Sequence, residues 1–93
     1  MNKYFNWEPA RSRQLLDERG ISFEDVVFYL QRCGLRDILG FRNPARDSQQ
    51  RVLAVEIDDY VYLVPYIETD EAYFLQSITP SKKATHVYAR DRK

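Results

Sequence analysis

The sequence has 93 residues, the size of one domain, and we expect a single domain over residues 1–93. With 44% hydrophobic and 14% aromatic residues, the composition is typical of a folded protein and excludes a disordered chain. The 14 basic and 14 acidic residues cancel, which argues against nucleic-acid binding by total charge alone. No apolar stretch approaches the roughly 20 residues that span a bilayer. Cys33 is the only cysteine, which excludes an internal disulfide and a Cys-rich zinc site, so we expect a cytoplasmic protein.

The first twenty residues predict a strand and a helix. The aromatic stretch YFNW (4–7) has the composition of a short strand. The N-terminus has no apolar segment of signal-peptide length, so we expect it to stay on the chain. A helix is then indicated over EPARSRQLLDERG (8–20). Pro9 occupies a first-turn position, where its missing N–H does no harm, and Gly20 is a typical helix end.

A second helix is predicted directly after Gly20. Ser22 and Asp25 have the spacing of a capping box, in which the two residues satisfy each other's backbone N–H groups. The apolar residues that follow have the periodicity of an amphipathic helix ending at Gly34, namely Phe23, Val26, Val27, Leu30 and Cys33. The short link between the two helices predicts a helical hairpin.

The middle of the chain predicts an antiparallel meander. A strand, a polar loop and three further strands are expected in order at residues 35–41, 42–50, 51–57, 60–67 and 72–78. Asp58 and Asp59 alone separate two of these strands, which predicts a two-residue hairpin turn. Pro65 cannot donate to a ladder, so we expect a bulge or an early end to pairing there. The fold class is therefore α+β: two N-terminal helices packed on a four-stranded, mainly antiparallel sheet, with a short C-terminal helix.

That C-terminal helix carries most of the charge contrast in the sequence. Residues 52–81 contain six acidic and no basic residues, whereas Ile78–Lys93 contains five basic residues and one aspartate. Thr79 is the expected cap. The expected buried face consists of Ala84, Val87 and Tyr88, and the expected polar face consists of Lys82, His86 and Arg90.

Two short segments resemble a known family. FNWEPARSRQLLDERGISFEDVV (5–27) is similar to the beginning of BrnT-like toxins, and SKKAT (81–85) is similar to a segment near the end of that family. The resemblance implies the fold of the RelE/ParE toxin superfamily. It also implies an RNA-cleaving toxin of a bacterial toxin–antitoxin pair, held inactive by an antitoxin protein from an adjacent gene in a toxin–antitoxin hetero-oligomer.

RNA cleavage without a metal requires a proton acceptor, a proton donor and cations that stabilise the transition state. His86 is the only imidazole, and a tyrosine or lysine with a shifted pKa can perform the same proton transfers. The candidate catalytic residues are Arg51, Lys82, Lys83, His86 and Tyr88, and the candidate RNA-binding residues are Arg42, Arg46 and Tyr66. With one histidine and one cysteine, no metal site and no cofactor are expected.

Each candidate has a simpler interpretation. His86 can be an ordinary surface histidine, and Lys82 and Lys83 can be solvated, although positive charge at a helix start opposes the helix dipole. Arg51 can pair with Glu56 or Asp70 instead of RNA. Arg42 and Arg46 can be merely exposed. Tyrosines along a strand can pack in the core instead of stacking on bases: Tyr60, Tyr62, Tyr66 and Tyr73.

Two main functions remain open at this point, beside a third interpretation in which the chain is a small structural protein with no toxic role. The first is a metal-independent endoribonuclease toxin that arrests growth. The second is a non-catalytic protein-binding toxin, or an antitoxin-partner module, with the same fold. The absence of a clear acid–base pair keeps the second function open.

Overall fold

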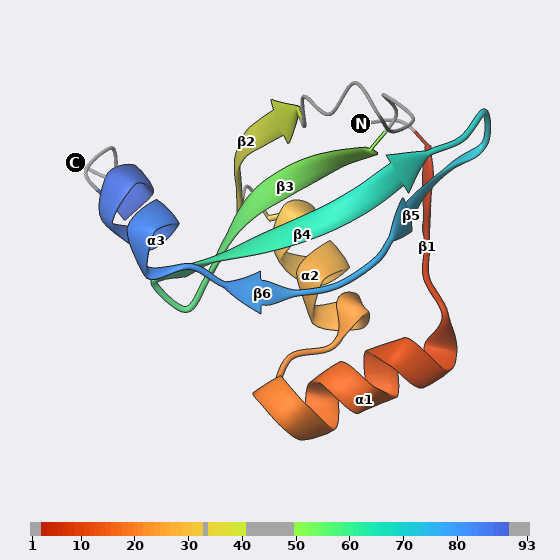
Figure 1. The fold of residues 1–93 in the computed structure, drawn as a ribbon, viewed down its shortest axis with the longest axis horizontal. Coiled ribbons are helices and arrows are strands. Elements are labelled where there is room, and N and C mark those ends of the chain that lie inside the picture. The colour runs from red at the N-terminus through yellow and green to blue at the C-terminus, as the bar shows by residue number, and fades with distance from the viewer. Residues whose placement is uncertain (1–2, 33, 41–49, 90–93) are drawn as a thin grey trace.

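The computed structural model describes residues 3–32, 34–40 and 50–89 (Figure 1). Described helices and strands follow in the order β1 (Tyr4–Asn6), α1 (Pro9–Arg19), α2 (Phe23–Leu30), β2 (Leu35–Gly40), β3 (Gln50–Ile57), β4 (Tyr60–Glu68), β5 (Ala72–Leu75), β6 (Thr79–Pro80) and α3 (Lys82–Ala89). The predicted α+β class is confirmed. No helix in these ranges is long and apolar enough to cross a membrane.

Both predicted N-terminal helices are present, and the predicted end of the first and beginning of the second are confirmed. Gly20 has a φ of 76°, which favours glycine, and its N–H donates to the Leu16 carbonyl at 2.9 Å. The Ser22–Asp25 capping box is complete: each side chain accepts the backbone N–H of the other residue. The second helix is shorter than predicted because it ends at Leu30, and Cys33 lies outside the described residues.

The sheet is mainly antiparallel, as predicted, but it has six described strands instead of four, and one of its pairings is parallel. Its order is β1-β5-β4-β3-β2, and β6 pairs with β4 beyond the end of β5. The first strand is parallel to β5, with Phe5 opposite Tyr73. A strand of three residues carries no pattern that selects its partner, so this pairing was not visible in the sequence.

The β3–β4 hairpin confirms the predicted two-residue turn. Ile57 pairs with Tyr60, and the φ angles of Asp58 and Asp59 are 52° and 69°. Two consecutive residues with positive φ form a type I′ turn, whose twist matches that of the two strands. Aspartate is among the residues that tolerate this conformation best.

Pro65 interrupts pairing on only one side of β4. Its pairing with Val52 of β3 lies within a continuous register. The Pro65 carbonyl accepts the Gln76 N–H at 2.8 Å on the other side, where β5 has ended and β6 has not begun. Because the N and O atoms of a strand residue point to the same side, the missing N–H does not belong to the β3 ladder. The predicted bulge is therefore wrong. The alternative prediction, an early end to pairing, applies only to the side of β4 that faces β5.

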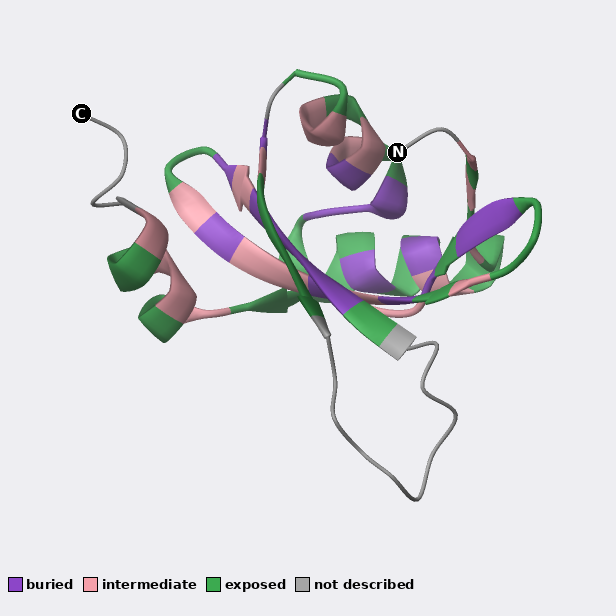
Figure 2. Cartoon of the chain, turned by 90° about the horizontal axis from the view of Figure 1, so that it is seen from above, coloured by how far each residue is buried: buried purple, intermediate pink, exposed green. Residues whose placement is uncertain are grey.

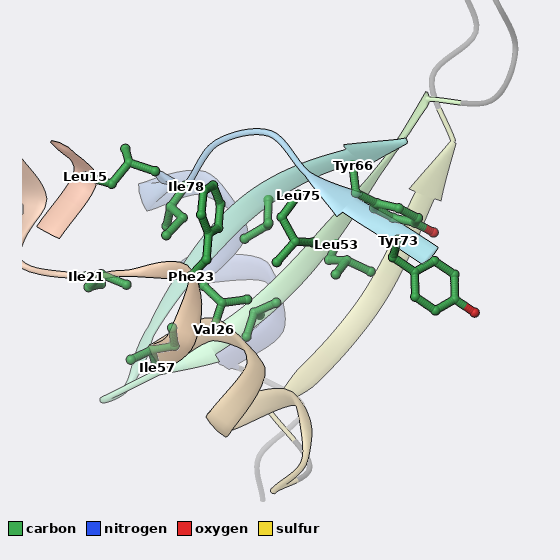
Figure 3. Packing of buried hydrophobic residues seen from close by; sticks show 12 residues of the cluster. Leu15, Ile21, Phe23, Val26, Leu53, Ile57, Tyr66, Tyr73, Leu75 and Ile78 are labelled. Carbon is green, nitrogen blue, oxygen red and sulfur yellow. The ribbon is translucent and has the colours of Figure 1, made fainter. Parts of the chain in front are cut away.

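The two faces of the sheet have different environments. The first, which we call the helix face, packs against α1 and α2 through a cluster that includes Leu15, Phe23, Val26, Leu53 and Leu75 (Figure 3). The opposite face, which we call the back face, comprises the residues that alternate with these along the strands: Val52, Ala54, Val61, Leu63, Pro65, Ile67 and Phe74. The third helix packs on the back face, at the β4 end that follows the hairpin (Figures 1 and 2).

Candidate nucleic-acid interface on the third helix

Ser81 fixes the beginning of α3 to the sheet. Its N–H donates to the Val61 carbonyl at 3.0 Å, and its hydroxyl accepts the Ala84 N–H at 3.0 Å. Ser81 is therefore the helix cap, in place of the predicted Thr79, which belongs to β6. The expected buried face is also corrected, because Val87 is 49% exposed, while Ala84, Thr85 and Tyr88 are partly buried.

Thr85 is a contact residue that the sequence did not reveal. Its Oγ1 accepts the Val61 N–H at 2.8 Å and donates to the Ser81 carbonyl at 2.7 Å. A threonine on a helix is usually read as surface, and only its place in the SKKAT segment pointed to it. The helix therefore docks through a polar contact, which an apolar-periodicity argument cannot detect.

Lys82, Lys83 and His86 lie together on the exposed side of this helix. All three are exposed, and His86 follows the lysines at the i+4 and i+3 positions, which are neighbours on a helix surface. The lysine N–H groups belong to the first turn, which has no acceptors within the helix. Two lysines thus stand at the positive end of the helix dipole, an arrangement that favours the binding of a phosphate.

Tyr88 lies in the last turn of α3 and faces the sheet. Its hydroxyl donates to Asp37 Oδ2 at 2.8 Å, and Asp37 Oδ1 accepts the Ile38 N–H at 2.8 Å. These contacts give Tyr88 a role in holding α3 to β2. The structure therefore does not bring Tyr88 together with His86, which lies two residues away on the exposed side.

Arg51 is not brought to this site either. It pairs with Tyr66 and so lies on the helix face, whereas α3 is on the back face. Its partner Tyr66 is five residues from Val61, a separation of roughly 16 Å along a strand. Glu56, one of the two alternative partners of Arg51, accepts Arg36 Nε at 2.9 Å. The structure therefore separates Arg51 from Lys82, although both are candidate catalytic residues.

Tyr66 is removed from the set of RNA-binding candidates. Only 2% of the residue is exposed, and its ring meets the Tyr73 ring edge-on at 5.7 Å (Figure 3). Burial raises the pKa of the Tyr66 phenol, with a smaller contribution from the charge of Glu68. A base cannot stack on a ring that is part of the core. The packing interpretation holds for Tyr66 and Tyr73.

Arg42 and Arg46 lie outside the described residues, so their assignment to RNA remains a prediction. Across residues 3–32, 34–40 and 50–89, no three His, Cys, Asp or Glu side chains are arranged to hold a metal ion. The described part of the site thus consists of Lys82, Lys83 and His86.

Comparison with known proteins places the chain in no family. No protein-family model matches it, and no curated protein or solved structure is significantly similar. The resemblance to BrnT-like toxins rests on the two sequence segments given above.

Proposed function

We propose that this protein is a metal-independent endoribonuclease toxin of a bacterial toxin–antitoxin pair, and that it holds the RNA backbone at the beginning of α3. The observation that carries the proposal is the cluster of Lys82, Lys83 and His86 on the exposed side of α3. The SKKAT segment, which resembles a segment of BrnT-like toxins, supplies the two lysines and the capping serine of this cluster.

The chemistry of the cluster suits cleavage by the 2′-hydroxyl of RNA. Attack of this hydroxyl on the adjacent phosphate builds negative charge on the phosphate oxygens, which Lys82 and Lys83 would stabilise. Imidazole is the side chain best suited to moving a proton near neutral pH, and His86 supplies one beside the two lysines. It stands one turn from both lysines, within reach of a phosphate bound between them.

Growth arrest tests the proposal in cells. We expect expression of the wild-type protein alone to stop growth, and co-expression of the antitoxin from the adjacent gene to restore it. The double variant Lys82→Ala/Lys83→Ala should be harmless because it lacks both cations. Arg13→Ala/Arg19→Ala removes two exposed cations from α1 and should remain toxic. A fully toxic Lys82→Ala/Lys83→Ala protein would show that the assigned surface is wrong.

The second candidate is a non-catalytic toxin that binds a protein target or serves only as an antitoxin partner. The separation of Arg51 and Tyr88 from His86 favours it, because one histidine then remains as the described proton-transfer group. Growth arrest without RNA cleavage, retained in His86→Gln, would support this second function.

A further inference from the structure

Among the described residues, α3 covers only half of the back face of the sheet. The half near the hairpin lies under α3, and Val61 and Ala54 there are 1% and 0% exposed. The other half carries exposed apolar side chains: Leu39 at 37%, and the cross-strand neighbours Ile67 and Phe74 at 39% each. Leu39 pairs with Val52, and Val52 pairs with Pro65, so these residues form a continuous row across three strands to the position next to Ile67 on the same face. We call this set the open patch; contiguous apolar surface of this kind is typical of an interface.

The same face carries opposite charges at its two ends. Lys82 and Lys83 are exposed at the beginning of α3, which follows β6 beside Tyr62 and Leu63. Asp70 and Glu71 are exposed in the turn between β4 and β5, beyond Ile67. The open patch therefore lies between the two lysines of α3, which stand at the same end of β4 as the Asp58–Asp59 turn, and the acidic turn that holds Asp70 and Glu71. In a two-fold dimer that reverses the direction of β4, the lysines of one copy face the acidic turn of the other, so the charges are complementary.

The third helix also has the shape and chemistry to fill the open patch of another copy. Val87 of α3 is an apolar side chain that is 49% exposed. Consider a two-fold axis that crosses β4 at Pro65 and lies between two facing back faces. This axis reverses the direction of β4 between the two copies. Val61 of one copy then lies opposite Thr69 of the other, since both residues are four positions from Pro65. The lysines of each copy then meet the acidic turn of its partner.

We propose that the back face binds a second copy of this chain, as a two-fold dimer in which each α3 covers the open patch of the other sheet. Both helices lie side by side in one layer between the two sheets. This places Val87 near Ile67 and Phe74 of the other copy and converts two half-covered sheets into one closed stack. The dimer does not depend on RNA cleavage. Because both proposals use Lys82 and Lys83, RNA and the second copy compete for these side chains.

Sedimentation equilibrium of the purified chain, over the micromolar concentration range, tests the dimer. We expect a dimer for the wild type and a monomer for Phe74→Glu, which places a charge in the centre of the interface. The matched control is Leu16→Glu, at an exposed leucine of α1 on the other side of the sheet, and it should remain dimeric. A wild type that stays monomeric at the highest concentration, or a dimer that survives Phe74→Glu, would overturn the proposal.

A charge exchange tests the relative orientation and does not rely on a core substitution. Lys82→Glu/Lys83→Glu and Asp70→Lys/Glu71→Lys each set like charges against each other, so each variant alone should be monomeric. In a mixture, every contact is again between opposite charges, and a heterodimer should form. If the mixture stays monomeric while the wild type is dimeric, the two-fold arrangement is wrong. RNA cleavage by the Phe74→Glu monomer, measured separately, distinguishes failure of the dimer from failure of the enzyme.

Discussion

Ser12 shows how a single buried polar residue joins the two N-terminal helices. It is 4% exposed, and its hydroxyl accepts the Phe23 N–H at 3.0 Å while donating to Glu24 Oε1 at 2.8 Å. The hydrogen bond from Ser12 is the main reason why the pKa of Glu24 lies below its ordinary value. A serine in the middle of a helix is normally unremarkable, so the sequence did not reveal this junction.

Ser12→Ala should therefore destabilise the protein. The substitution leaves the buried Phe23 N–H without an acceptor, which costs about 1–3 kcal/mol in the free energy of unfolding. Urea denaturation measures this difference. Thr79→Ala, at an exposed position of β6, is the control and should change the unfolding free energy little. Equal stability of Ser12→Ala and the wild type would show that the contact contributes nothing.

At the scale of helices and strands, the sequence predicts what is determined locally. Gly20, the Ser22–Asp25 pair and the Asp58–Asp59 turn each act over a few residues, and all three predictions are confirmed. The parallel pairing of β1 and the docking of α3 join residues far apart in the chain. They depend on backbone edges and on single polar side chains such as Thr85, which leave no periodic pattern in the sequence.

The docking of α3 can be tested at Thr85. Thr85→Val keeps the shape of the side chain but leaves the Val61 N–H without its acceptor, so we expect a loss of about 1–2 kcal/mol in unfolding free energy. Amide hydrogen exchange should also become faster in α3 than in α1 and α2. Thr79→Val is the matched control. Unchanged exchange in α3 would mean that other contacts hold the helix.

At the scale of the whole molecule, the distribution of charge matters more than the net charge of zero. The sequence drew attention to Lys82, Lys83 and His86; the structure places them on the exposed side of α3, and their role stays a prediction. It also grouped them with Arg51 and Tyr66, because a one-dimensional pattern does not show which face of a sheet a strand residue occupies. The candidate site is therefore smaller than the sequence predicted.

Salt dependence measures how many phosphates this surface contacts. Binding to single-stranded RNA should weaken with added salt, with a slope in log K against log salt of about −0.7 for each phosphate contact. Lys82→Ala/Lys83→Ala should reduce the magnitude of this slope by about 1.4, and Arg13→Ala/Arg19→Ala should leave it unchanged. Fluorescence anisotropy with a labelled RNA gives the slopes. Identical slopes for all three proteins would place the RNA elsewhere.

Incubation of the purified protein with RNA in EDTA tests most directly our proposal that the Lys82–Lys83–His86 surface cleaves RNA without a metal. We expect cleavage that leaves 2′,3′-cyclic phosphate ends. That cleavage should be lost in Lys82→Ala/Lys83→Ala and in His86→Gln, and retained in Arg13→Ala/Arg19→Ala. Intact RNA after incubation with the wild-type protein, or equal cleavage by the wild type and the Lys82→Ala/Lys83→Ala variant, would contradict it.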